Sequence, residues 1–240
     1  MKQLEITILI FSFIILQSCK QHVKENISSD NEQKILHQED FSSSSIPNDL
    51  FIEGSKKVVI RDGHLWVDAV ADSIGESNVS TIWLNKEFSG DLKVEFDASV
   101  IQSPGDQNNI NFFFLYSDPS GKSLFESSDL RKDGSYKTYH NLNGYIFTYL
   151  ANGNPDTARF RFRDCPGFNL LKENNTYHCI KDSIYRIEII KKGNSLTYSV
   201  DGKTYLDIKD YANPIHSKGI IGFRTWKTEL WWDNLIVTQL

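Results

Sequence analysis

The sequence has few cysteines, no excess of positive charge and no apolar segment long enough to cross a membrane. Only three cysteines occur among 240 residues. None has a CxxC or other metal-ligand spacing, so we expect no zinc. We expect no cofactor and assign no metal site, and a structural calcium ion between loops stays an open alternative. The net charge of −5 argues against a nucleic acid as the partner. The apolar run from Ile6 to Leu16 is too short to span a bilayer.

The first residues instead have the features of an export signal. The apolar run follows Met1-Lys2 and ends in Leu16-Gln17-Ser18-Cys19, which resembles the lipobox of bacterial lipoproteins. We therefore expect a signal peptide over residues 1–18 and lipidation of Cys19. The protein is then an exported lipoprotein of a Gram-negative-type bacterium, held at the outer membrane on its periplasmic side or at the cell surface. The alternative is simple secretion with a cut nearby.

After the signal peptide, we expect the rest of the chain to consist of one tether and one folded domain. Residues 19–45 are polar and serine-rich, so we expect a flexible tether. Residues 46–240 are enough for one domain with its own core, and we expect a monomer. Cys165 and Cys179 form a disulfide in an exported protein or remain two buried thiols. The sequence leaves these alternatives open because it does not give the Cα separation.

The sequence has no pattern of a long amphipathic helix. Instead, apolar and polar residues alternate in short segments that are separated by Gly, Asn, Asp or Pro. The alternation predicts strands over residues 64–70, 80–84, 91–100, 109–116, 145–150, 158–163, 183–190, 195–200, 204–208, 219–224 and 230–237. Many short strands at this spacing predict an all-β fold, an antiparallel β-sandwich of the jelly-roll type. Four C-terminal segments resemble the ending of concanavalin-like jelly rolls, namely residues 185–190, 195–203, 219–226 and 231–237. Trp231 and Trp232 are consecutive, so they face opposite ways, and one of them is expected to cap the core.

Three arginines alternate with two phenylalanines over residues 159–163. Side chains change sides with a period of two, so the guanidiniums lie on one face, about 7 Å apart given a rise of roughly 3.3 Å per residue. This spacing is comparable to that of successive sugars in a glycan. Like charges on one sheet face repel, so we expect carboxylates from neighbouring strands or an anionic ligand over them. With aromatic residues nearby, this face suits a carboxylated or sulfated saccharide. The alternative is an ordinary solvated face.

From about residue 46 onward, the chain resembles jelly-roll lipoproteins of polysaccharide-utilisation clusters, and most of all the ulvan-oligosaccharide dehydratase type. The segments that carry this resemblance are 109–114, 143–149 and 158–164. The resemblance implies removal of water from a non-reducing-end uronic acid linked to sulfated rhamnose, which leaves an unsaturated uronate. The implied partner is therefore an anionic oligosaccharide that bears uronate and sulfate.

Elimination across C4 and C5 of a uronate needs a group that neutralises the carboxylate, a base for the C5 proton and an acid for the oxygen that leaves C4. Tyr145 and Tyr149 share one strand face, and adjacent guanidiniums would lower the pKa of a tyrosine base. The same guanidiniums would keep a His140 base uncharged. The candidate catalytic residues are His140, Tyr145, Tyr149 and Arg161. The candidate substrate-binding residues are Asn109, Asn111, Tyr139, Arg159, Arg163, Arg224 and Trp226.

Two other activities use the same face. A polysaccharide lyase would break the glycosidic bond by the same elimination, and a non-catalytic lipoprotein would only bind anionic glycans. Hydrolysis ranks third because it normally needs two carboxylates at a fixed separation, and Glu95 and Asp97 come nearest to such a pair.

Overall fold

The computed structural model describes residues 33–54, 57–70, 78–212 and 215–240. The expected signal peptide, the lipidation site Cys19 and the first part of the tether lie outside these residues. No helix in the described ranges has the length and apolar character needed to cross a membrane.

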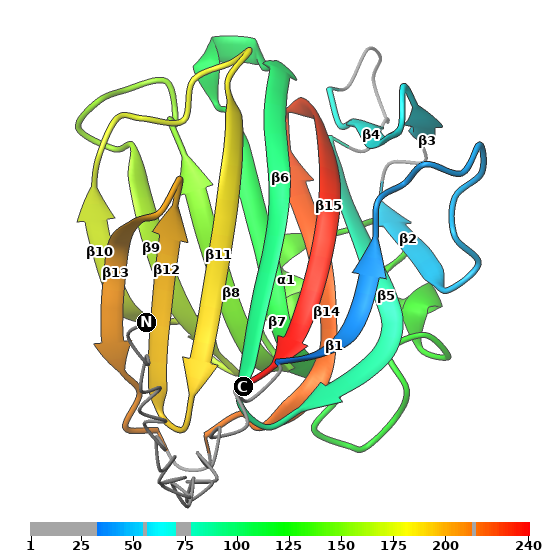
Figure 1. Cartoon of the computed structure of the whole chain (residues 1–240), viewed down its shortest axis with the longest axis vertical. Coiled ribbons are helices and arrows are strands. Elements are labelled where there is room, and N and C mark those ends of the chain that lie inside the picture. The colour runs from blue at the N-terminus through cyan, green and yellow to red at the C-terminus, as the bar shows by residue number, and fades with distance from the viewer. Residues whose placement is uncertain (1–32, 55–56, 71–77, 213–214) are drawn as a thin grey trace, which may run out of the picture. The chain divides into compact units, whose positions relative to one another are not determined.

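The described residues form two antiparallel β-sheets stacked face to face (Figure 1). The eight-stranded sheet contains β1 (Lys34–Glu39), β3 (Val58–Arg61), β4 (His64–Asp68), β6 (Leu92–Gln102), β11 (Ile184–Lys192), β12 (Ser195–Val200), β13 (Lys203–Lys209) and β15 (Glu229–Gln239). The seven-stranded sheet runs in the order β10-β9-β8-β7-β14-β5-β2. Its members are β2 (Leu50–Gly54), β5 (Val79–Ser89), β7 (Asn109–Ser117), β8 (Asn143–Leu150), β9 (Arg159–Cys165), β10 (Asn169–Asn175) and β14 (Lys218–Trp226). The predicted antiparallel β-sandwich is therefore confirmed.

The main core lies between the sheets and takes alternate residues from each strand. On β9, Phe160 and Phe162 are fully buried in this core. On β15, Trp232 is buried there, and its ring stacks on Phe223 with centroids 4.9 Å apart. Because alternate side chains point the other way, the arginines of β9 lie on the outer face of the seven-stranded sheet.

The folded part begins earlier than the sequence suggests. Strand β1 pairs with β15 along residues 34–39, within the segment expected to be a flexible tether. Leu36 packs against the main core, and Phe41 has no exposed surface. The expected tether boundary at residue 45 is therefore wrong, because backbone pairing at a sheet edge and two apolar anchors order this polar segment.

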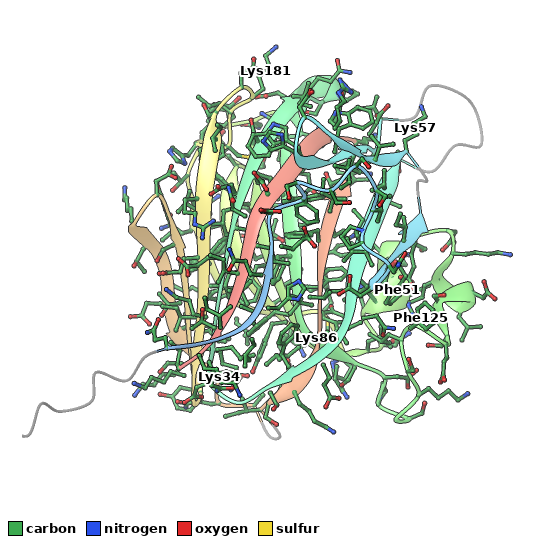
Figure 2. The ribbon with its side chains drawn as sticks, turned by 45° about the vertical axis from the view of Figure 1, so that its right-hand side comes forward. Lys34, Phe51, Lys57, Lys86, Phe125 and Lys181 are labelled. Carbon is green, nitrogen blue, oxygen red and sulfur yellow. The ribbon has the colours of Figure 1, made fainter. Side chains whose placement is uncertain are left out.

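The connection between β7 and β8 folds over the outer face of the seven-stranded sheet. It carries the short helices η2 (Ser128–Arg131) and α1 (Tyr136–Tyr139). Beneath it, Trp83, Phe113 and other residues form a second apolar cluster. Figure 2 shows Phe51 of β2 and Phe125 of this connection facing each other, and their ring centroids are 5.3 Å apart. The connection therefore covers one part of this sheet face and leaves the neighbouring part open.

Candidate functional site

A row of outward-facing side chains crosses the whole seven-stranded sheet. The strand registers place opposite one another, from β10 to β2, the residues Glu173, Arg161, Thr148, Asn111, Arg224, Thr81 and Glu53. Every member is polar or charged, and the two carboxylates stand on the two edge strands. The interior of the row is therefore left with two guanidiniums and short hydrogen-bonding side chains.

This row forms part of the wall of a cavity of about 810 Å³. Six residues named from the sequence line it, namely Asn109, Asn111, Arg159, Arg161, Arg224 and Trp226. They come from β7, β9 and β14, which the sheet order places close together around β8. We call this cavity the arginine cleft. Its volume is in the range of ligand pockets, roughly 300–1,000 Å³.

One carboxylate serves two of the arginines of the cleft. Glu173 accepts a hydrogen bond from Arg161 Nε at 2.6 Å, and its Oε2 lies 3.6 Å from Arg159 Nε. Arg163 does not line the cleft. Its guanidinium stacks on the Phe168 ring at 3.9 Å and donates a hydrogen bond to the Phe168 carbonyl. The carboxylate expected over the arginine face is therefore present. Asp133 also lines the cleft, so three arginines are set against two carboxylates and an excess of one positive charge remains.

Arg224 is buried without a carboxylate partner among the described residues, and its exposed fraction is 2%. Its two terminal nitrogens donate to Thr81 Oγ1 at 2.6 Å and to the Gly134 carbonyl at 3.0 Å. Its guanidinium lies 4.7 Å from the centre of the Tyr136 ring. Burial lowers the pKa of Arg224, while nearby tyrosines and Glu53 oppose that shift. An uncompensated buried charge is expensive, so an anion bound in the cleft would relieve it.

Two further polar atoms of the cleft are buried and lack a hydrogen-bond partner in the described part of the chain. They are Oδ1 of Asn111 and Nε of Arg159. Asn111 donates through Nδ2 to Asn109 Oδ1 at 3.0 Å, which fixes its amide plane. Most buried polar atoms in proteins are paired. The cleft therefore offers one acceptor without a partner and one donor whose ion-pair partner, Glu173, is beyond hydrogen-bond distance at 3.6 Å.

Aromatic residues close one side of the arginine cleft. Tyr136 of α1 and Phe168 line it, and His140 stacks on Phe168 with ring centroids 3.8 Å apart. Burial raises the pKa of Tyr136 to about 12, although Arg224 acts in the opposite direction. Burial and then the charges of Arg224 and Arg163 lower the pKa of His140. At neutral pH the phenol therefore keeps its proton and the imidazole is neutral.

The two predicted tyrosine bases lie on the wrong face of β8. Tyr145 and Tyr149 are fully buried between the sheets, and the Tyr145 hydroxyl donates to Asp210 at 2.6 Å while Tyr149 pairs with His178. The pKa of each is raised, first by burial, rather than lowered by the arginines. Their assignment as catalytic bases is wrong, since the arginines are on the opposite side of the sheet.

Tyr139 does not reach the cleft. It lies beneath the aromatic wall with no exposed surface, and its hydroxyl donates to Glu53 at 2.7 Å. Glu53 also accepts from Trp83 and pairs with Arg131 at 2.9 Å. This buried network attaches the connection between β7 and β8 to the sheet, so the contribution of Tyr139 is structural.

The structure also decides two alternatives that the sequence left open, one about carboxylates and one about cysteines. Glu95 and Asp97 lie on the eight-stranded sheet, where Arg186 lies within ion-pair distance of both, away from the arginine cleft. Cys165 and Cys179 are free and buried. Cys165 belongs to the apolar cluster under the connection and Cys179 to the core between the sheets, so they are on opposite faces and cannot be bridged.

Some residues of the cleft were not predicted from the sequence as site residues. Among them are Tyr136, Thr148, Asn152 and Phe168. Thr148 lies opposite Arg161 in the register, but alternation along β8 did not show that its face is the outer one. Phe168 gave no signal in the sequence, because it lies outside the strands, just before β10, and its place at the cleft depends on the fold. In the described ranges, no group of three or more His, Cys, Asp or Glu residues could hold a metal ion.

Comparisons with known proteins agree with this architecture. A family model described as a domain of unknown function (DUF6250) matches residues 74–235. The uncharacterized protein YesU of Bacillus subtilis (strain 168) is 27% identical over 204 residues, which cover 80% of this chain and 90% of that protein.

Solved structures of low sequence identity share the fold. A Bacillus subtilis protein of unknown function with a galectin-like fold has a TM-score of 0.74 at 24% identity, over 86% of this chain and 98% of that one. The VIP36 lumenal domain bound to Ca²⁺ and Man3GlcNAc has a TM-score of 0.60 at 12% identity, over 87% and 90%. An endo-β-1,3-glucanase of Pyrococcus furiosus has a TM-score of 0.59 at 11% identity, over 86% and 94%.

Proposed function

The chain belongs to the DUF6250 family, and we propose that it binds anionic oligosaccharides of the ulvan type, which bear uronate and sulfate, in the arginine cleft. The observation that carries this proposal is the buried Arg224, which has no carboxylate partner among the described residues, at the bottom of a cavity that also holds Arg159 and Arg161. Guanidiniums bind carboxylate and sulfate through paired hydrogen bonds. The fold is shared with a lumenal domain that was solved with Man3GlcNAc bound and with a glucanase.

In this proposal, Arg224 binds the carboxylate of the sugar. The amide oxygen of Asn111, which has no partner among the described residues, accepts a hydrogen bond from a sugar hydroxyl. Arg159 and Arg161 then face a sulfate on the next residue, because their positions on β9 are about 7 Å apart. A flat apolar sugar face packs on Trp226 or Tyr136, which both line the cavity.

The aromatic wall favours binding of the end of a chain. Tyr136 and Phe168 close the cleft beside α1, and Gly134 of the same connection lies against Gly54 and Val79 at the other side. A long polymer passing straight through would have to cross these residues. We therefore propose that the terminal uronate occupies the closed end and that the rest of the oligosaccharide leaves over β9 and β10.

We also propose that the bound uronate loses water. The C5 proton passes to a base, the C4–C5 double bond forms, and the C4 oxygen departs with a proton from an acid. Neutral His140 suits the base, and Tyr136, which keeps its proton, suits the acid. The ring centroids of these two residues are 4.7 Å apart. Tyr136 lines the cavity, whereas His140 is not among its lining residues and would have to reach the substrate past Tyr136 and Phe168. Arg224 would stabilise the negative charge that builds on the carboxylate.

The test is incubation of the full chain with saturated ulvan oligosaccharides and with ulvan polymer, followed by ultraviolet absorbance and mass spectrometry. A dehydratase produces the unsaturated-uronate absorbance with a loss of one water per oligosaccharide. The same absorbance with shorter products indicates a lyase. Saturable binding without any absorbance change contradicts elimination and leaves a glycan-binding protein, while absence of binding contradicts the whole proposal.

Single substitutions separate binding from chemistry. Tyr136→Phe and His140→Gln should lower the rate of elimination by about two to three orders of magnitude and leave most of the affinity. Arg161→Gln should weaken binding. An anchor at the outer membrane, on its periplasmic side or at the cell surface, is a proposal that follows from residues 1–19, and mass spectrometry for a lipidated Cys19 tests it.

A further inference from the structure

The outer face of the eight-stranded sheet carries a second pocket lined by tryptophans. Trp66 on β4 and Trp231 on β15 lie directly opposite each other in the register. Together with their neighbours they line a cavity of about 230 Å³, which we call the tryptophan pocket. Its residues are Arg61, Asp62, His64, Trp66, Ile101 and Trp231. Trp231 is partly exposed, whereas the adjacent Trp232 is fully buried in the core.

Polar side chains hold the two indole rings in place. The centroid of the His64 ring is 4.2 Å from that of Trp231, and His64 Nε2 lies 3.7 Å from the Asp233 carboxylate. The Arg61 guanidinium lies over the Trp66 ring, 4.5 Å from its centre. The Trp66 indole N–H is buried and has no hydrogen-bond partner among the described residues. Such unpaired donors are uncommon in native proteins.

The charges at the tryptophan pocket differ from those at the arginine cleft. Arg61 and Asp62 are exposed and carry opposite charges, so the rim has both donors and acceptors without an excess of either sign. Indole faces pack against the C–H faces of a sugar ring, and charged side chains at a rim hydrogen-bond to its hydroxyls. A cavity of about 230 Å³, against about 810 Å³ in the cleft, has room for little more than one ring.

We propose that the tryptophan pocket is a second carbohydrate site, which binds one neutral pyranose residue of a glycan. It lies on the opposite outer face of the sandwich from the arginine cleft and does not depend on it. A protein with both sites could hold a neutral part of a polysaccharide on one face while a charged chain end occupies the other. Two linked sites of this kind raise the local concentration of the ligand.

The test observes the indole N–H signals of the full chain by ¹⁵N NMR, since it has five tryptophans. The probe is an ulvan oligosaccharide that has been desulfated and carboxyl-reduced, which removes its charge. We expect this neutral probe to shift the signals of Trp66 and Trp231 and to leave that of Trp226 unchanged. The charged parent oligosaccharide should shift Trp226.

Variants identify the pocket that binds. Trp231→Ala should weaken binding of the neutral probe by at least about tenfold, as expected for an aromatic anchor. Arg61→Ala, at an exposed position, should also weaken it and serves if Trp231→Ala does not fold. Arg161→Gln is the matched control and should leave binding of the neutral probe unchanged.

The results for the two sites are separable. A neutral probe that shifts neither Trp66 nor Trp231, or that shifts only Trp226, overturns the tryptophan pocket as a sugar site. If the charged oligosaccharide leaves Trp226 unmoved while the neutral probe shifts Trp231, the proposal for the cleft fails and the second site stands.

Discussion

Arg131 and Arg224 are both buried arginines, with exposed fractions of 4% and 2%, and they differ in their partners. Arg131 pairs with the buried Glu53 at 2.9 Å, whereas Arg224 has only Thr81, the Gly134 carbonyl and aromatic faces. Replacing each by methionine, which keeps much of the volume, therefore distinguishes a structural arginine from one that faces a ligand.

Arg131→Met leaves Glu53 buried without its cation, with only the hydrogen bonds from Trp83 and Tyr139. Breaking a buried ion pair costs about 3–5 kcal/mol, so the melting temperature should fall by about 6–20 °C. Arg224→Met removes a buried charge, which is favourable. It also removes two hydrogen bonds of about 1 kcal/mol each and one cation–π contact. These effects largely cancel, so its stability should stay within about 2 kcal/mol of the parent.

Binding should respond in the opposite order. A hydrogen bond to a charged group contributes about 1.5–3 kcal/mol, so Arg224→Met should weaken binding of a uronate-terminated oligosaccharide roughly ten- to a hundredfold. Folded Arg131→Met should keep the parent affinity. Thermal melts and titration calorimetry measure both quantities. If Arg224→Met destabilises the chain as much as Arg131→Met and leaves the affinity unchanged, Arg224 is a structural residue and the reasoning fails.

Three further predictions follow from the same contacts. Glu173→Gln should tighten binding of anionic oligosaccharides several-fold at low salt, because it frees Arg161 and Arg159, and calorimetry at high salt should show a smaller gain. His140 has a folded-state pKa below its ordinary 6.5, first because of burial, so the unfolded chain binds the extra proton more readily and stability is lost as the pH falls below about 6.5. His140→Gln should reduce that loss in melts recorded across this pH range. Deleting residues 1–40 removes β1 from the edge of β15 and should lower the melting temperature relative to that of a variant that lacks residues 1–32 only.

Alternation within single strands was enough to predict the strands of the core and part of the cleft. Successive side chains of a strand lie on opposite faces of the sheet. This alternation places Arg159 and Arg161 of β9 on the face opposite to Phe160, and Asn111 of β7 on the face opposite to Phe112. The strand order β9-β8-β7-β14 could not be predicted, because the pairing of distant strands depends on the whole fold. That order is what brings the guanidinium of Arg224 opposite Asn111.

The strands missed by the sequence reasoning include edge strands. On β1 and β10, most side chains are exposed or half-buried, so no apolar alternation marks them. These strands are ordered mainly by backbone pairing with β15 and β9. Strand β10 nevertheless supplies Glu173. The sequence analysis therefore predicted a carboxylate beside the arginines but not which residue carries it.

Strand β8 explains why the predicted tyrosine bases were placed on the wrong face. Its residues from Gly144 onward are buried on both sides, because the connection between β7 and β8 covers its outer face. When both faces are apolar, alternation does not tell which one faces the core. Ile146 and Thr148 face outward, and the tyrosines face the core with Phe147. The connection that hides the outer face also supplies Tyr136 and His140, so the candidate acid and base come from the same segment that made the strand ambiguous.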